Sequence, residues 1–143
     1  MKLPPPSESS HPVDVGLRTE AHITGELVRR GYTVLLPFGV NQRYDLVLDD
    51  GGRFVRVQCK TGRLRHGVVL FSGISVRCNT REILTRGYEG EVELFLISCP
   101  DNDRIYAVPI EEVTGGCGSL RVAPTRNGQR RRVRWARDYE LPG

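Results

Sequence analysis

The stretch RYDLVLDDGGRFVRVQCKT, residues 43–61, contains two extended runs, and apolar and polar residues alternate along the second. The runs are separated by Asp50-Gly51-Gly52, and an acid followed by glycine between two such runs is a strong signal for a β-hairpin. We therefore expect one strand over residues 43–50 and a second over residues 53–61, paired antiparallel. This hairpin is the part of the fold that the sequence predicts most directly.

Side chains alternate between the two faces of a strand, so parity decides which residues of the hairpin meet. Val57 and Cys59 share the apolar face of the second strand, whereas Gln58 and Lys60 share the opposite face. Asp45 lies on the first strand, and the twist of a sheet allows it to converge with Gln58 and Lys60 near one end of the hairpin. The pattern thus predicts a cluster of one carboxylate, one amide and one ammonium group.

This cluster suits a hard divalent cation, which prefers oxygen ligands. The Asp45 carboxylate, the Gln58 amide oxygen and the intervening backbone carbonyl of Cys59 could supply them. A metal ion would polarise a phosphodiester and lower the pKa of a bound water, while a neighbouring ammonium offsets the charge of the transition state. Lys60 is one of only two lysines beside 19 arginines. Its compact ammonium fits such a site better than a broad guanidinium does.

Outside the hairpin, the chain alternates between helical and extended patterns. A helix is predicted from about Asp14, a suitable N-cap, to Gly31, a suitable C-terminal stop. Its expected buried face consists of Leu17, Ala21, Thr24, Leu27 and Val28. Further strands are expected over residues 32–38, 67–73, 92–99 and 104–110. Residues 75–90 are polar, interrupted by glycine, and carry no clear pattern. This order predicts an α/β fold in which an N-terminal helix flanks a mixed sheet.

The length and composition indicate one domain. A chain of 143 residues can bury a single core without disulfide or metal support. We expect a disordered Pro/Ser-rich leader over residues 1–13 and one domain over residues 14–143 that ends in a basic tail. No apolar run is long enough to span a membrane, and we expect a cytoplasmic protein. The four cysteines lack zinc-ligand spacing, and the net charge of +4 is compatible with a polyanionic partner.

A helix with Glu20, then RYDL, a hairpin turn and VQCKT, in that order, resemble the motif set of the PD-(D/E)xK nucleases. The chain is most similar to the small endonucleases of this superfamily that are associated with group I introns. It is more distantly similar to archaeal-type Holliday junction resolvases, and the likeness covers roughly residues 16–140. The resemblance implies a restriction-endonuclease-like mixed sheet and a DNA endonuclease that uses Mg²⁺, with Mn²⁺ as a substitute.

The resemblance also implies roles for individual residues. Asp45 matches the motif aspartate and Lys60 the motif lysine, while Gln58 replaces the usual second acid. A neutral amide removes one negative charge, so we expect weaker metal binding than at an all-acid site. The intron-associated group carries Gln at this position, which indicates a variant site. Glu20 is the expected helix acid, with Glu26 as the second candidate. The implied metal ligands are Glu20, Asp45, Gln58 and the Cys59 carbonyl.

Arginines near the expected cluster and in the tail could hold DNA phosphates on both sides of the scissile bond. Each could also be a solvated surface charge, and Trp135 could pack into the core instead of stacking on a base. The expected DNA-binding residues are Arg18, Arg43, Arg63, Arg65, Arg77, Arg81, Arg134 and Trp135.

The sequence leaves alternatives for function. Within the endonuclease class, a junction-resolving enzyme competes with a homing or restriction-like enzyme, and either is expected to act as a homodimer or higher oligomer. A nucleic-acid-binding module that kept the fold without catalysis is the alternative from another class. A structural protein with no nucleic-acid role is a third possibility.

Overall fold

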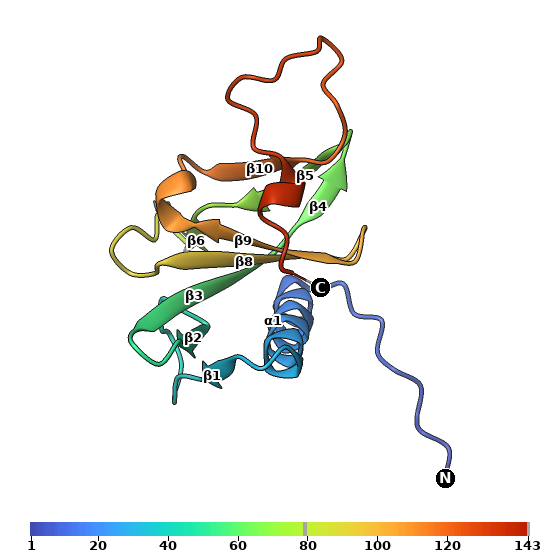
Figure 1. Ribbon diagram of the computed structural model, residues 1–143. Coiled ribbons are helices and arrows are strands. Elements are labelled where there is room, and N and C mark those ends of the chain that lie inside the picture. Colours follow the sequence, from blue (N-terminus) through green and yellow to red (C-terminus); the bar gives the residue numbers. More distant parts are fainter. Residues whose placement is uncertain (79, 143) are drawn as a thin grey trace.

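The computed structural model describes residues 1–78 and 80–142, with the side chains of Arg77 and Cys78 outside the described part. One long helix and two sheets form three layers (Figure 1). The five-stranded sheet has the order β1 (Thr33–Leu35), β2 (Leu46–Asp49), β3 (Phe54–Thr61), β8 (Leu94–Cys99) and β9 (Arg104–Pro109). Its β3 and β8 run parallel, and the other neighbours run antiparallel. The expected mixed sheet with a flanking N-terminal helix is therefore present.

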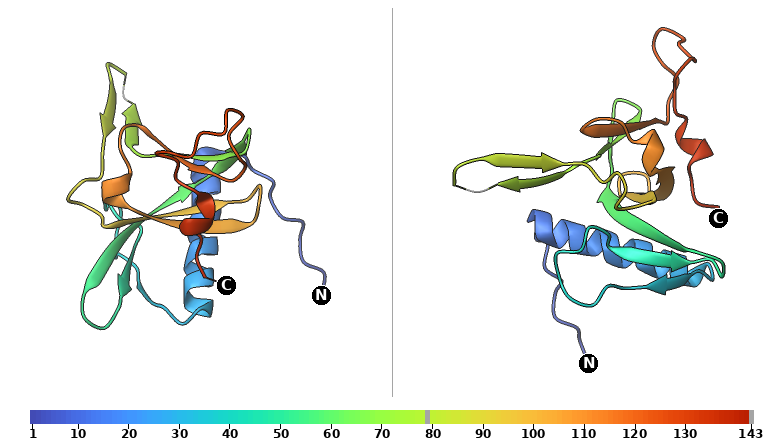
Figure 2. Two further views of the ribbon diagram at one scale, coloured as in Figure 1. Left: turned by 45° about the horizontal axis from the view of Figure 1, so that its top comes forward. Right: turned by 90° about the vertical axis from the view of Figure 1, so that its left-hand side faces the viewer.

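A second sheet of three strands has the order β10 (Cys117–Arg121), β5 (Val68–Ser72) and β4 (Arg63–Arg65). The strands β6 (Ser75–Cys78) and β7 (Ile83–Arg86) form a separate hairpin, which projects away from the body of the protein (Figure 2). Two short 3₁₀ helices, η1 (Ile110–Glu112) and η2 (Ala136–Asp138), follow β9 and the C-terminal loop. The sequence did not predict β4, the β6–β7 hairpin or β10, because each is short, polar or exposed.

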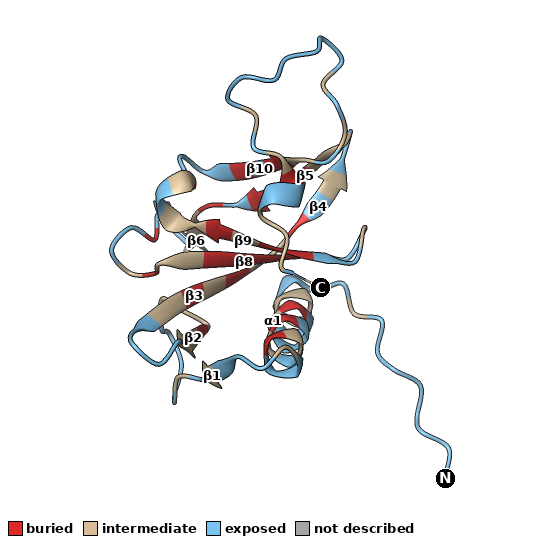
Figure 3. Ribbon diagram, viewed as in Figure 1, coloured by how far each residue is buried: buried red, intermediate tan, exposed pale blue. Residues whose placement is uncertain are grey.

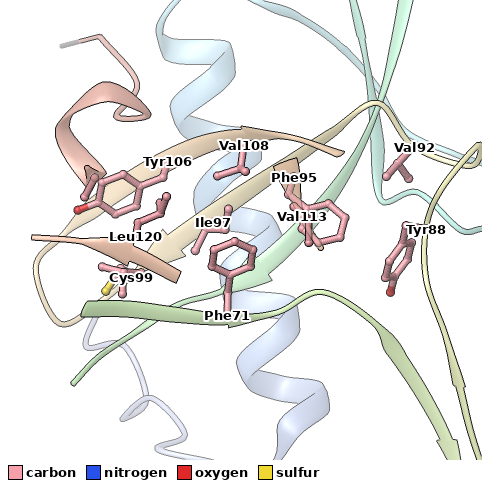
Figure 4. Packing of buried hydrophobic residues seen from close by; sticks show 12 residues of the cluster. Phe71, Tyr88, Val92, Phe95, Ile97, Cys99, Tyr106, Val108, Val113 and Leu120 are labelled. Atoms are coloured by element: carbon pink, nitrogen blue, oxygen red, sulfur yellow. The ribbon is translucent and has the colours of Figure 1, made fainter. Parts of the chain in front are cut away.

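Two apolar clusters lie on opposite faces of the five-stranded sheet (Figure 3). On one face, Ile23 and Leu27 of α1 (Pro12–Arg29) pack on Val57 of β3 and Leu96 of β8. On the other, residues of the three-stranded sheet pack on neighbouring positions of β8, among them Phe95 (Figure 4). Because β8 is covered on both faces, it reads as a continuous apolar run instead of an alternating one.

The helix α1 differs from the sequence prediction at its start and on its buried face. His11 is the N-cap, since its Nδ1 accepts from the N–H of Val13, and the helix begins at Pro12 inside the expected leader. The buried stripe is Thr19, Ile23 and Leu27, while the predicted core residues Leu17 and Val28 are exposed. The stripe is narrow because α1 contacts the sheet along one line of side chains spaced by four residues.

Gly31 ends α1 as predicted. Its φ of +87° is readily accessible only to a residue without a Cβ. The N–H groups of Gly31 and Tyr32 donate to the carbonyls of Val28 and Leu27, which forms a Schellman ending.

The strands of the first hairpin, β2 and β3, pair as the sequence predicts. β2 is shorter than expected, and so is β1, which precedes the hairpin. Leu46 lies opposite Val57 and Asp49 opposite Phe54. The turn is stabilised by Asp50, whose Oδ1 accepts from the N–H groups of Gly52 at 3.0 Å and Arg53 at 2.8 Å. This register brings the start of β2 beside the middle of β3.

The described residues contain no helix that is long and apolar enough to cross a membrane. Cys59, Cys99 and Cys117 are free thiols. Within residues 1–78 and 80–142, no group of three or more His, Cys, Asp or Glu residues could hold a metal ion.

Candidate active site

Asp45 directly precedes β2, and both its backbone and its side chain are bound to β3. Its N–H donates to the Val57 carbonyl at 2.8 Å, and its Oδ2 accepts from the Cys59 N–H at 2.8 Å. Burial raises the pKa of Asp45 above its usual value, while the Cys59 N–H and the Lys60 ammonium act in the opposite direction. The Cys59 N–H of β3 therefore orients the carboxylate through Oδ2, and Oδ1 takes no part in that hydrogen bond.

Glu20 approaches the Asp45 carboxylate from α1. The helix is joined to β3 beside it, since the buried Thr19 places its Oγ1 2.6 Å from Oγ1 of Thr61. Burial raises the pKa of Glu20, and the negative charge of Asp45 raises it further. The two carboxylates are thus close enough to repel each other, which is an unfavourable arrangement unless a cation or a proton is shared between them.

Glu26, the other helix acid considered, has different partners. Its carboxylate forms ion pairs with Arg29 at 2.8 Å and Arg30 at 3.4 Å. The hydrogen bond from Arg29 is the largest cause of its lowered pKa. Of the two helix acids, Glu20 is therefore the one whose carboxyl responds to the charge of Asp45.

Gln58 and Cys59 lie in the middle of β3. The half-buried Gln58 follows Val57, and Cys59 packs with the α1 cluster, so the strand alternation directs Gln58 to the face opposite α1. Burial raises the pKa of the Cys59 thiol, and the charges of Asp45 and Glu20 raise it further. Cys59 consequently stays a neutral thiol and is unsuited to act as a thiolate ligand or nucleophile.

Lys60 lies on the same face of β3 as Gln58. Its Nζ donates to the carbonyl of Ile74 and to the hydroxyl of Tyr88, both at 3.2 Å. The same Nζ lies 4.7 Å from the centroid of the Tyr88 ring and 5.7 Å from that of Phe95. Its charge lowers the pKa of Asp45. The ammonium therefore lies near Asp45 while its donors are bound by residues at the two ends of the β6–β7 hairpin.

Arg43 is occupied by contacts within the protein. It forms an ion pair with Glu91 and donates to Ser75 Oγ at 2.8 Å and to the Gly87 carbonyl at 2.6 Å. Its guanidinium carbon lies 4.2 Å from the centroid of the Tyr88 ring. Arg43 thus connects both ends of the β6–β7 hairpin to the body of the protein.

The other arginines expected to bind DNA are spread over several elements. Arg18 donates to the Ser9 carbonyl at 2.7 Å, and Arg65 lies 3.8 Å from Asp101. Among these arginines, the residues that are exposed to solvent are Arg18, Arg63, Arg65, Arg81 and Arg134. The side chain of Arg77 lies outside the described residues.

Trp135 is half-buried, with the guanidinium carbon of Arg137 5.1 Å from its ring centroid. It forms an isolated bridge with Arg121 at the end of β10. This bridge places Trp135 against the three-stranded sheet, which contains neither Asp45 nor Lys60.

Two residues around the site were missed from the sequence. Tyr88 belongs to the segment without a pattern, and only the folded chain brings its hydroxyl to Lys60. Thr61 follows Lys60 directly, but its bond to Thr19 depends on how α1 packs on β3. Neither residue carries a local signal that would have identified it.

Comparison with known proteins identifies the family and supports the fold. A profile of the PD-(D/E)XK endonuclease family matches residues 10–142. No curated protein matches the chain. Among solved structures, the chain is similar to the bacterial homing endonuclease I-Ssp6803I, with a TM-score of 0.71 and 22% sequence identity over 92% of this chain and 89% of the other. Because the family profile covers nearly the whole chain, the protein belongs to the PD-(D/E)XK endonuclease family.

Proposed function

We propose that the protein is a divalent-metal-dependent DNA endonuclease that hydrolyses phosphodiester bonds. The observation that carries the proposal is the position of the Asp45 carboxylate, which accepts a hydrogen bond from the Cys59 N–H of β3, responds to the charge of Lys60 and raises the pKa of Glu20. An acid and a lysine in this arrangement, in a chain of the endonuclease family, support phosphodiester hydrolysis at this site.

The donor groups at the site fit a hard cation. Burial raises the pKa of both Asp45 and Glu20, and the charge of Asp45 raises that of Glu20 further, so a positive charge between them would be stabilised. Asp45, Glu20, the Gln58 amide oxygen and the Cys59 carbonyl would hold Mg²⁺, or Mn²⁺ in its place. A bound ion would polarise the scissile phosphate and lower the pKa of a water ligand.

The side chains of this protein perform the remaining work. The Lys60 ammonium has three N–H donors, of which two bind Ile74 and Tyr88, so one is left to orient a water or a phosphate oxygen. Its positive charge also offsets the negative charge that develops on the phosphate in the transition state. Asp45 is oriented in advance by the Cys59 N–H, which limits reorganisation during the reaction.

A second candidate function is DNA binding without catalysis. Gln58 occupies the position of an acid, and the described residues contain no group of three or more metal-ligating acids, histidines or cysteines. A site with two carboxylates would bind a cation more weakly than one with three. If the loss of charge abolished metal binding, the protein would keep its DNA affinity and its salt dependence but would not cleave.

Two kinds of DNA are candidate substrates. The structural neighbour is a homing endonuclease, which favours a linear duplex target, while the fold is compatible with a branched one. We further propose that the protein acts as a homodimer or higher oligomer, because one chain carries one candidate site and a duplex or junction offers two strands to cut. We also propose that it acts in the cytoplasm.

The direct test is cleavage of a panel of linear and four-way-junction DNAs in Mg²⁺, Mn²⁺ or EDTA. We expect metal-dependent cleavage by the parent protein and its loss in Asp45→Asn and Lys60→Met. The matched control is Asp49→Asn, at the last residue of the strand that Asp45 precedes, where the Asp49 Oδ1 accepts from the N–H of Gly51 in the turn. This variant should cleave normally.

Each outcome of this test has a defined meaning. DNA binding without cleavage in any metal would favour the inactive module. Cleavage by Asp45→Asn at the parent rate would place the chemistry elsewhere in the protein. The absence of both binding and cleavage would refute a nucleic-acid role.

A further inference from the structure

The β6–β7 hairpin is attached to the body through residues that bind Lys60. Ile74 directly precedes β6, and Tyr88 follows β7 by two residues. Both accept a hydrogen bond from Lys60 Nζ at 3.2 Å. The ammonium is thus bound by one acceptor from each end of a hairpin that projects into solvent (Figure 2).

Tyr88 is held more rigidly than a surface tyrosine. Only 5% of it is exposed, and its ring packs edge-to-face on Phe95 with the centroids 5.3 Å apart. Figure 4 shows the two rings beside each other at the edge of the apolar cluster. A hydroxyl on a ring that cannot rotate away provides a fixed acceptor, which is what an otherwise flexible lysine side chain needs in order to keep one position.

Arg43 also contacts the Tyr88 ring. The guanidinium carbon is 4.2 Å from the centroid of the Tyr88 ring, and the side chain also binds Ser75 in β6 and the Gly87 carbonyl. Its ion pair with Glu91 supplies a negative charge near two cations that would otherwise repel each other. Arg43 therefore fixes both ends of the hairpin around Tyr88.

We propose that Tyr88 and Arg43 are positioning residues for Lys60, so that the two ends of the β6–β7 hairpin determine where the lysine ammonium lies in the site. The proposal rests on the endonuclease function proposed above. It assigns Tyr88 a role in the rate of the chemical step rather than in DNA affinity. It also assigns Arg43 an internal role in place of the phosphate contact expected from the sequence.

The first experiment measures the position of Lys60 without using activity. The chain contains only Lys2 and Lys60, so protein labelled with ¹³C at lysine Cε should give two lysine signals. Lys60→Met identifies which one belongs to Lys60. We expect a restricted Lys60 Cε in the parent and fast motion in Tyr88→Phe, which keeps the ring and its packing but lacks the hydroxyl. Lys2 should be unchanged in both proteins.

The second experiment separates rate from affinity. Under single-turnover conditions with saturating metal, Tyr88→Phe should lower the cleavage rate constant roughly 10- to 100-fold and leave the Kd for DNA within about twofold. The matched control is Tyr106→Phe. Tyr106 is 2% exposed and accepts a hydrogen bond from Asn102 at 2.8 Å, so it loses a comparable buried contact away from Lys60.

Arg43→Gln distinguishes positioning from DNA contact. A phosphate contact would weaken DNA binding and reduce the slope of log Kd against log salt by about 0.9. The positioning role predicts an unchanged slope and a slower single-turnover rate. Arg53→Gln, at an exposed arginine of the β2–β3 turn that is not among the expected DNA-binding residues, is the matched control for removal of a surface charge.

The proposal is overturned if the Lys60 signal is equally restricted in the parent and in Tyr88→Phe. It is also overturned if Tyr106→Phe slows cleavage as much as Tyr88→Phe does, or if Arg43→Gln changes only affinity and salt dependence. A parent protein that cleaves no DNA would refute the endonuclease function, whereas the lysine signals would still report whether Tyr88 positions Lys60.

Discussion

Replacing Gln58 with Glu would add the carboxylate that the site lacks, and the structure allows the effect to be calculated. Asp45 Oδ2 lies 2.8 Å from the backbone nitrogen of Cys59. That nitrogen is about 2.4 Å from the Cα of Gln58, so the new carboxylate would lie within roughly 9 Å of the existing one, and we take roughly 6 Å as the separation. Two unit charges at this separation repel by about 0.7 kcal/mol in water and about 3 kcal/mol at an effective dielectric constant of about 20.

The Gln58→Glu variant should therefore be less stable than the parent without metal and should bind metal more tightly. A loss of about 1 to 3 kcal/mol corresponds to a fall in Tm of roughly 3 to 10 °C for a chain of this size. The same repulsion is relieved by a cation, so affinity for Mg²⁺ or Mn²⁺ should rise roughly 5- to 100-fold. Scanning calorimetry in EDTA and titration calorimetry with Mn²⁺ measure the two effects.

The control is Gln129→Glu, the same substitution at an exposed residue of the C-terminal loop. It should change neither the Tm in EDTA nor the metal affinity in the same way. If Gln58→Glu and Gln129→Glu behaved alike in both measurements, Gln58 would not face the acids, and the proposed ligand set would be wrong.

Two further predictions concern stability. Because burial raises the pKa of Asp45 in the folded protein, this group favours folding only below its unfolded pKa of about 3.9, and that contribution is lost as the pH rises through the higher folded value. Asp45→Asn should thus raise the Tm of metal-free protein at pH 7, and a difference that stayed constant down to about pH 3 would contradict this cause. Gly62→Ala would place a Cβ 2.8 Å from Ile97 Cγ2 and 2.9 Å from Val69 Cγ1, and both of these residues are fully buried. The substitution should lower the free energy of unfolding, measured with urea, by about 1 to 3 kcal/mol. Gly25→Ala, in α1 with nothing within 4 Å of its Cβ, should instead stabilise by about 0.5 to 1 kcal/mol; equal effects of the two glycine substitutions would refute the packing argument.

The first hairpin could be predicted because its signals are local. The Asp-Gly-Gly turn and the period-two alternation specify both the pairing and the faces, and the structure has Leu46 opposite Val57 as that pattern requires. The apolar run of β8 was predicted for the same reason, since a strand buried on both faces has a continuous apolar sequence.

The face of α1 was predicted less well. Leu17 and Val28 are apolar but exposed, while the polar Thr19 is buried against β3. Helical periodicity alone is compatible with more than one buried face for α1, and only the contact with the sheet selects one of them. The β6–β7 hairpin was missed because it packs little apolar surface on the body, so its sequence has no buried face to mark it.

The sequence by itself determined the hairpin, the parity that places Gln58 and Lys60 together, and the order of helix acid, aspartate and lysine that marks the family. These depend on neighbours along the chain or on a single turn. The tertiary structure decided which helix acid approaches Asp45, and it brought Tyr88 and Ile74 to the ammonium of Lys60. Those contacts join residues 14 to 28 positions apart through the packing of separate elements. No local pattern can specify such contacts, because they depend on the way the layers pack on each other.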